Sequence, residues 1–238
     1  MKIGILQCDD VQEQFLAEHK NYPEMFMNLF LKEDPTCTFS VYKVHEGELP
    51  ASTKECPAWI ITGSRYSVYE NLPWLPPFFK FVRQLYKNNC KLVGICFGHQ
   101  VIAQALGGSV SRSEKGWGVG MSFNQVTHCK PWMQPSSKSL NLIVSHQDQI
   151  MTLPDSARIL ASSDFCPYYM VSYDDHFLSI QGHPEFSHSY IKDLMLSRKG
   201  RIPEERIAEG LNSLHTESDA QLSIRWILKF LFYASSER

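Results

Sequence analysis

The cysteine at position 96 lies in a pattern typical of a catalytic nucleophile. Cys96 is the centre of a G-x-C-x-G sequence, after an apolar run and before a helix-like stretch, which is the arrangement of a nucleophile elbow. Such a turn is tight, and Gly94 and Gly98 remove two side chains that it would crowd. A helix that begins after the cysteine would favour the thiolate and leave the backbone N–H of Phe97 free to stabilise an oxyanion.

The other cysteines show no comparable setting. The chain has seven cysteines, an odd number, scattered and without a C-x-x-C pair. This argues against a disulfide framework or a zinc ribbon and indicates a reducing compartment. A buried structural role is the usual one for a lone cysteine. Because strand, glycines and helix coincide only around Cys96, we predict that it is the nucleophile; a redox-sensing, non-catalytic thiol is the alternative.

A thiol enzyme needs a base, and the sequence offers a histidine next to a carboxylate. His183 and Glu185 follow an apolar strand, and residues two apart in an extended chain point to one side. The imidazole would move the proton, and the carboxylate would fix its tautomer and support its charge. Spacing alone cannot bring His183 to Cys96. Other histidines therefore remain candidates, namely His99, His146, His188 and His215.

A metal site is the competing interpretation of the same region. His146, Asp148, His183 and Glu185 together offer two imidazoles and two carboxylates. It would leave the elbow around Cys96 unexplained, and a zinc site would normally recruit a nearby thiolate. We therefore predict neither a metal nor another cofactor.

The elements that must position these residues alternate between strands and helices. Apolar, β-branched runs predict strands at Lys2–Gln7, Thr38–Val44, Ala58–Thr62 and Lys91–Ile95, the last three buried. Helical spacing predicts a crossover helix over 75–86 and a second helix after Cys96 that stops at Gly107-Gly108. This alternation indicates an α/β fold with a mostly parallel sheet, whose carboxyl edge is the expected place for a ligand.

The remainder of the chain is first β-like and then helical. Strands are predicted at Val119–Val126, Leu140–Val144 and Arg158–Ala161, followed by a hairpin of 168–173 and 176–181 that turns at Asp174-Asp175. The glycines of 116–120 indicate a loop entering a strand, not a nucleotide loop. Ser218 and Gln221 predict a capping box before a C-terminal helix whose most apolar part is Trp226–Tyr233.

Size and composition limit the classes of function. A chain of 238 residues without internal repeats or long linkers fits one domain, 1–238. Its formal net charge of −2 gives no reason to expect nucleic acid or an anionic membrane as partner. The apolar stretches are shorter than the roughly 20 residues of a membrane helix or a typical signal segment, so we expect a cytoplasmic protein.

With these motifs in place, the chain resembles the class I glutamine amidotransferases, specifically their triad-type glutaminase domain. The segment 94–100, Gly94-Ile95-Cys96-Phe97-Gly98-His99-Gln100, is similar to the nucleophile block of the family. Three further segments are similar to its glycine loop, a substrate-contacting segment and its His-Pro-Glu block, in the order of the family: Ile61-Thr62-Gly63-Ser64, Ser145-His146-Gln147-Asp148 and Gly182-His183-Pro184-Glu185.

The resemblance implies a flavodoxin-like fold, a γ-glutamyl thioester on Cys96 and an oxyanion hole from Gly63 and Phe97. It also implies recognition of the amino-acid head of the substrate by three residues, Gln100, Ser145 and His146. The glycine loop departs from the two glycines and proline of the family, since Ser64 and Arg65 follow Gly63. We therefore add Arg65 to the predicted substrate-binding residues.

Three classes of function remain. No P-loop follows in the sequence, and the resemblance is greatest to stand-alone members, some of which are γ-glutamyl peptidases. The first class is a hydrolase of γ-glutamyl amides or peptides that acts on a small molecule through Cys96. The second is a glutaminase subunit that delivers ammonia to a separate synthase subunit. The third, the redox-sensing module, would not need the His-Pro-Glu block or the glycine loop.

Overall fold

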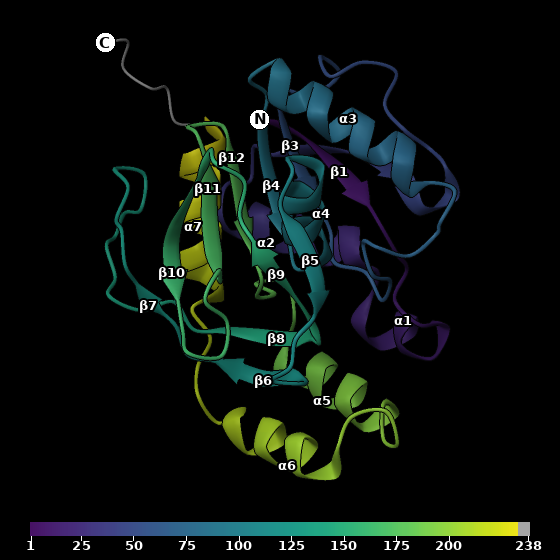
Figure 1. Ribbon diagram of the computed structural model, residues 1–238, viewed down its shortest axis with the longest axis vertical. Coiled ribbons are helices and arrows are strands. Elements are labelled where there is room, and N and C mark those ends of the chain that lie inside the picture. The colour runs from purple at the N-terminus through teal and green to yellow at the C-terminus, as the bar shows by residue number, and fades with distance from the viewer. Residues whose placement is uncertain (233–238) are drawn as a thin grey trace.

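The computed structural model describes residues 1–232, and an eight-stranded sheet forms its centre (Figure 1). The strand order is β2-β1-β3-β4-β12-β11-β10-β7. These strands are β1 (Lys2–Gln7), β2 (Thr38–Lys43), β3 (Ala58–Ile61), β4 (Lys91–Ile95), β7 (Gln125–Val126), β10 (Ala157–Ser162), β11 (Met170–Tyr173) and β12 (Phe177–Ile180). Two small sheets pair β5 (Ser109–Arg112) with β9 (Asp148–Thr152) and β6 (Gly118–Ser122) with β8 (Leu142–His146).

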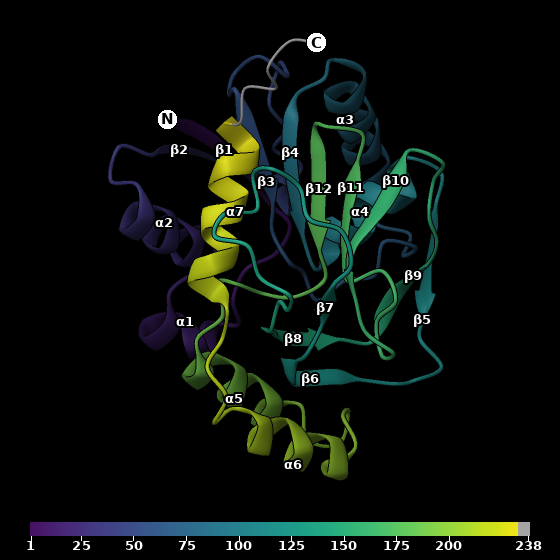
Figure 2. The same cartoon turned by 90° about the vertical axis from the view of Figure 1, so that its left-hand side faces the viewer.

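Helices cover both faces of the large sheet. The helices of residues 1–232 are α1 (Glu13–His19), α2 (Tyr22–Glu33), α3 (Leu75–Lys87), α4 (Phe97–Ala105), α5 (His188–Ser197), α6 (Glu204–Ser213) and α7 (Ala220–Phe232), of which α5 and α6 pack on the small sheet of β6 and β8. In β3, Ala58 and Ile60 join the core with α2 and α7, whereas Trp59 and Ile61 join the core with α3 and α4. This period of two is why a strand buried on both faces is apolar throughout. Figure 2 shows α7 in front of the sheet, with α3 and α4 behind it.

The sheet is mostly parallel, as the alternating pattern predicted. The neighbouring pairs β2–β1, β1–β3, β3–β4 and β4–β12 are parallel. At the other side of the sheet, β11, β10 and β7 are added by antiparallel pairing. The hairpin of β11 and β12 forms where it was predicted, with Asp174 in its turn at φ 47°. Gly107 ends the elbow helix at φ 99°. The α/β class and the flavodoxin-like arrangement are confirmed.

Several local predictions were wrong. The strand at Thr38–Lys43 is only partly buried, because β2 is the edge of the sheet. The single strand predicted at Val119–Val126 is two strands, β6 and β7, in different sheets. The capping box does not form. Within the described chain the hydroxyl of Ser218 has no hydrogen-bond partner, and Asp219 precedes the first residue of α7.

The C-terminal helix α7 packs on the core and contacts α2 and β4. It ends at Phe232 in the described structure, so Tyr233, the last residue of the apolar segment predicted there, lies outside the described residues. Over residues 1–232, none of the helices has both the length and the apolar character needed to span a membrane.

Candidate active site

Three neighbouring strands deliver the candidate catalytic residues to one edge of the sheet. Gly63 follows β3, Cys96 follows β4 and His183 follows β12, and these strands are adjacent and parallel. Carboxyl ends of adjacent parallel strands meet at the same edge. The strand order therefore brings together three residues that lie far apart in the sequence.

Cys96 is the turn residue between β4 and α4. Its backbone is in a strained region, with φ 51° and ψ −98°, and it caps the helix. A Cβ at Gly94 would lie 2.4 Å from the carbonyl oxygen of Gly98, and a Cβ at Gly98 would lie 2.7 Å from the Cβ of Ile61. Both glycines are thus required for the turn and for its close packing on β3, as the sequence pattern predicted.

His183 and Glu185 form a buried pair beside the cysteine. Nδ1 of His183 lies 2.7 Å from Oε1 of Glu185, and the side chains are 4% and 0% exposed. The imidazole stacks on the ring of Phe186, with centroids 3.8 Å apart, and the backbone N–H of His183 donates to the carbonyl of Ile143 on β8. These contacts fix the position and the plane of the ring, so its other nitrogen can face Cys96.

The electrostatics of His183 favour a protonated ring. Burial by itself lowers the pKa of His183, but the charges of Glu185 and Cys96 and the hydrogen bonds with both side chains raise it to about 10. At neutral pH an imidazolium therefore lies beside the sulfur. This is the state in which a cysteine acts as a nucleophile and its partner histidine as an acid.

The competing histidines are placed for other roles. His99 is fully buried behind the elbow, where Nδ1 contacts the hydroxyl of Ser179 at 2.7 Å and burial lowers its pKa to about 3. Burial lowers the pKa of His146 to about 4, and its Nδ1 lies 3.1 Å from the carbonyl of Asp148. His188 and His215 are exposed. Of the five histidines considered, His183 is the one that contacts Cys96.

The metal interpretation is not supported by the geometry. Among the described residues, three or more possible ligand atoms lie within 4.8 Å of one another in only two groups, Asp10 with His45 and Glu46, and Glu18 with His19 and Asp193. Neither group contains a residue of the competing metal set.

The glycine loop lies against His183 and Cys96. A Cβ at Gly63 would lie 2.8 Å from Cε1 of His183 and 3.8 Å from the Cβ of Cys96, so a side chain there would collide with the imidazole. The loop is held from the far side by Asp9, which follows β1 and is 4% exposed. Its carboxylate accepts from the backbone N–H of Arg65 at 2.8 Å and from Nε of Arg65 at 2.8 and 3.0 Å.

Replacing Asp9 by asparagine is expected to lower kcat by about 10-fold, with a smaller change in KM. The substitution keeps the size of the side chain but removes the charge that holds the loop, and misplacing one oxyanion donor costs up to roughly 10²–10³-fold. Steady-state kinetics on a γ-glutamyl substrate would test this, with the exposed Glu46→Gln as control. An Asp9→Asn enzyme with a lower melting temperature but unchanged kcat would assign Asp9 a purely structural role.

A cleft open to solvent lies beside the buried Cys96, which is part of its lining. It brings together every substrate-side residue predicted from the sequence, since it is lined by Arg65, Gln100, Ser145 and His146. The buried amide of Gln100 donates to the carbonyl of Asp148 at 3.0 Å. The guanidinium of Arg65 is engaged by Asp9, and its Nη2 donates to the carbonyl of Asp10 at 2.7 Å.

Several residues of the site were missed by sequence reasoning. Nε2 of Gln181, at the end of β12, contacts the sulfur of Cys96 at 3.4 Å. Nη1 of Arg198, which follows α5, donates to the hydroxyl of Ser145 at 2.7 Å. The position of Gln181 two residues before His183 could have indicated its orientation, because alternate residues of a strand share a face. Arg198 carries no local signal, since it reaches the cleft only through tertiary packing.

Comparison with known proteins agrees with this geometry. The family model for the class-I glutamine amidotransferases matches residues 33–201. Gamma-glutamyl peptidase 4 of Arabidopsis thaliana is 31% identical over 183 residues, 73% of this chain and 71% of the relative. One component chain of the glutamine-hydrolysing GMP synthase of Sulfolobus acidocaldarius is 31% identical over 137 residues, 57% of this chain and 71% of that protein. The chain belongs to the class I glutamine amidotransferase family.

The fold is shared with a solved member of the same family. The crystal structure of a glutamine amidotransferase from Thermotoga maritima covers 98% of this chain and 99% of its own, with a TM-score of 0.78 and 20% sequence identity. The predicted membership of the family is confirmed.

Proposed function

We propose that this protein is a cysteine-dependent hydrolase of γ-glutamyl amide bonds, and that γ-glutamyl peptides are its substrates. The observation that carries the proposal is the buried His183–Glu185 pair at the sulfur of a strained cysteine, at the base of an open cleft. The similarity to a γ-glutamyl peptidase over 73% of the chain supports the choice of substrate.

The proposed reaction has two halves. The sulfur of Cys96 attacks the γ-carbonyl carbon, and the resulting oxyanion accepts hydrogen bonds from the backbone N–H groups of Gly63 and Phe97. Collapse of this intermediate breaks the C–N bond, and the imidazolium of His183 gives its proton to the leaving amine. Water, deprotonated by His183, then attacks the γ-glutamyl thioester and releases glutamate, while the sulfur regains its initial state. The proton given to the leaving amine and the proton taken from the water both move through His183, and the γ-carboxylic acid that forms loses its remaining proton to solvent.

The placement of residues supports one cooperative domain. The proposed site draws on segments from Asp9 to Arg201, and α7 packs on β4, which carries Cys96. We therefore propose that residues 1–238 act as a single unit in the cytoplasm, where the seven free thiols would stay reduced.

The purified chain alone is expected to hydrolyse γ-glutamyl dipeptides, with kcat/KM of roughly 10³–10⁵ M⁻¹s⁻¹, and to be slower on free glutamine. Release of the amino acid and of ammonia would be followed side by side. As control, a diazoketone analogue of glutamine should modify Cys96 stoichiometrically and leave the other six cysteines free, because only Cys96 pairs with His183.

A glutaminase subunit is the second candidate, because the Sulfolobus relative is one component of a synthase. Such a subunit is expected to be silent until a partner orders its oxyanion loop. If the chain ignores γ-glutamyl peptides but hydrolyses glutamine after a cell extract or synthase partner is added, the hydrolase proposal is wrong and this second function stands.

A further inference from the structure

The cleft at Cys96 carries an excess of positive charge. Its lining includes four arginines and one carboxylate, namely Arg65, Arg112, Arg198, Arg201 and Asp148. Arg65 is paired with Asp9, and the carboxylate of Asp148 accepts from the hydroxyls of Ser67 and Tyr69. Among residues 1–232, no carboxylate lies within 4.0 Å of the guanidinium nitrogens of the other three arginines.

Two of these arginines are fixed against one aromatic ring. The guanidinium carbons of Arg198 and Arg201 lie 5.7 and 5.5 Å from the centre of the Trp117 ring. Such stacking holds a guanidinium while leaving its N–H edges open. Burial lowers the pKa of Arg198, and the neighbouring charge of Arg201 lowers it further. The protein therefore keeps two adjacent positive charges in this cleft that no carboxylate of residues 1–232 pairs with.

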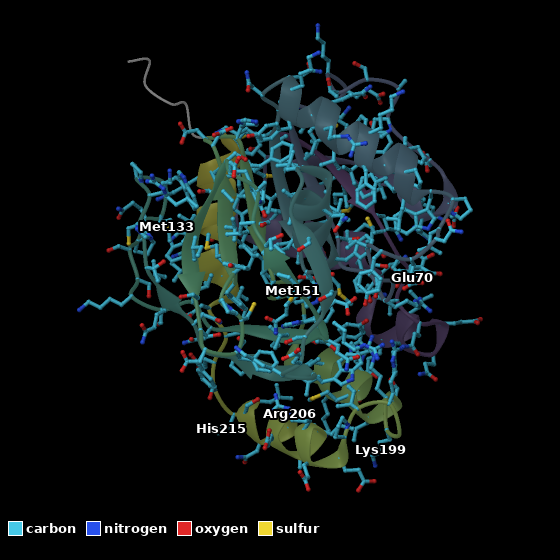
Figure 3. The ribbon with its side chains drawn as sticks, in the orientation of Figure 1. Glu70, Met133, Met151, Lys199, Arg206 and His215 are labelled. Atoms are coloured by element: carbon cyan, nitrogen blue, oxygen red, sulfur yellow. The ribbon has the colours of Figure 1, made fainter. Side chains whose placement is uncertain are left out.

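The segment that carries these arginines is held to Trp117 by further hydrogen bonds. Arg198 and Arg201 lie in the connection between α5 and α6, at the end of the molecule where Figure 3 labels Lys199 and Arg206. Nε and Nη2 of Arg206 donate to the backbone carbonyl of Trp117 at 3.1 and 2.9 Å. The backbone of Trp117 is thus tied to α6, and its ring offers both guanidinium groups a contact surface at the cleft.

Two neighbouring guanidinium groups suit a ligand with two carboxylates. A γ-glutamyl group supplies one, its α-carboxylate. Free glutamine carries no other, whereas a γ-glutamyl peptide with an unblocked C-terminus carries a second on the group that leaves. Guanidinium groups bind carboxylates through paired, charge-assisted hydrogen bonds.

We propose that Arg201 binds the free carboxylate of the leaving group, and that Arg198 with Ser145 receives the α-carboxylate of the γ-glutamyl group. The preferred substrates would then be γ-glutamyl peptides with a free C-terminus. This inference rests on the proposed hydrolase function. It assigns the carboxylate of the leaving group to Arg201 and not to Arg65, the arginine predicted from the sequence to bind substrate, because the guanidinium of Arg65 is held by Asp9.

The test compares γ-glutamylalanine with its C-terminal amide as substrates of the purified chain. The wild type should prefer the free acid by roughly 10- to 100-fold in kcat/KM, the range of one charge-assisted contact. Arg201→Ala should bring this ratio close to 1, mainly through the KM of the free acid, and Arg201→Glu should favour the amide. The control is Lys199→Ala, which removes a nearby charge outside the cleft lining and should keep the wild-type ratio.

The outcomes separate the inference from the function on which it rests. A wild type that cleaves acid and amide equally, or an Arg201→Ala enzyme that keeps the preference, would overturn the inference and leave the hydrolase intact. If neither compound is cleaved, the hydrolase proposal fails. The affinities of γ-glutamylalanine and of its amide for the wild type and for Arg201→Ala, measured by calorimetry, would then still decide whether Arg201 binds the carboxylate.

Discussion

Replacing His183 by alanine is expected to lower kcat on a γ-glutamyl peptide by roughly 10⁴–10⁶-fold, the range for removing one member of a catalytic triad. The imidazole is the group that contacts both the sulfur of Cys96 and the carboxylate of Glu185. Without it, the leaving amine receives no proton and water is not activated. Cys96→Ala should cause a loss of similar size.

The double variant gives the sharper measurement. When residues act as a unit, the first substitution removes most of their joint contribution to kcat. The double variant His183→Ala/Cys96→Ala should therefore have a kcat hardly lower than that of either single variant. The exposed His188, five positions along the chain, provides the matched control, and His188→Ala should keep normal turnover. A folded His183→Ala enzyme with near-normal kcat would contradict the assignment and direct attention to His99 or His146.

The arrangement of the candidate catalytic residues was largely predictable because its signals are local. The two glycines around Cys96 are required by the geometry of one turn, and both contacts lie within the elbow or on the adjacent strand. Likewise, His183 and Glu185 are two residues apart, so an extended backbone suffices to bring them together. The spacing of residues along the sequence could not predict the distance between the elbow and the His183–Glu185 pair. That distance depends on β4 and β12 being neighbours in the sheet.

The substrate side of the cleft was predicted less completely, because its contacts are tertiary. Arg198 and Arg201 follow a helix in a polar stretch that resembles any exposed connection, and they reach the cleft only because Trp117 is fixed next to them. Arg65 was assigned to substrate binding, but nothing in the sequence indicated that Asp9, in the loop after β1, would hold its guanidinium. The burial of β2 was predicted wrongly for the same reason, since strand order decides which strand is the edge.

Glu185→Gln should change both the rate and the pH dependence of the enzyme. Glutamine keeps the shape and can still accept a hydrogen bond from Nδ1 of His183, but it carries no charge. We expect kcat to fall by roughly 10²–10⁴-fold, less than for His183→Ala, because an orienting carboxylate contributes less than the base itself.

The pH profile identifies the cause of that loss. In the wild type the pKa of His183 is raised to about 10, so the imidazolium that protonates the leaving amine persists through neutral pH, and the alkaline decline of kcat/KM should lie near pH 10. In Glu185→Gln the burial of the ring acts without the opposing carboxylate. The charge and the hydrogen bond of Cys96 still raise the pKa of the ring, so the alkaline decline should move down from pH 10 toward the ordinary histidine value of about 6.5.

The pH dependence of stability provides a second, independent test that Glu185 raises the pKa of His183. Because the folded-state pKa of His183 is raised, its pairing with Glu185 stabilises the native state fully below about pH 6.5, and this contribution is lost as pH rises toward 10. The difference in melting temperature between the wild type and Glu185→Gln should therefore be larger at pH 6 than at pH 10. The exposed Glu204→Gln serves as control and should show neither change. An alkaline limb that stays in place in Glu185→Gln would show that this carboxylate does not hold the proton on His183.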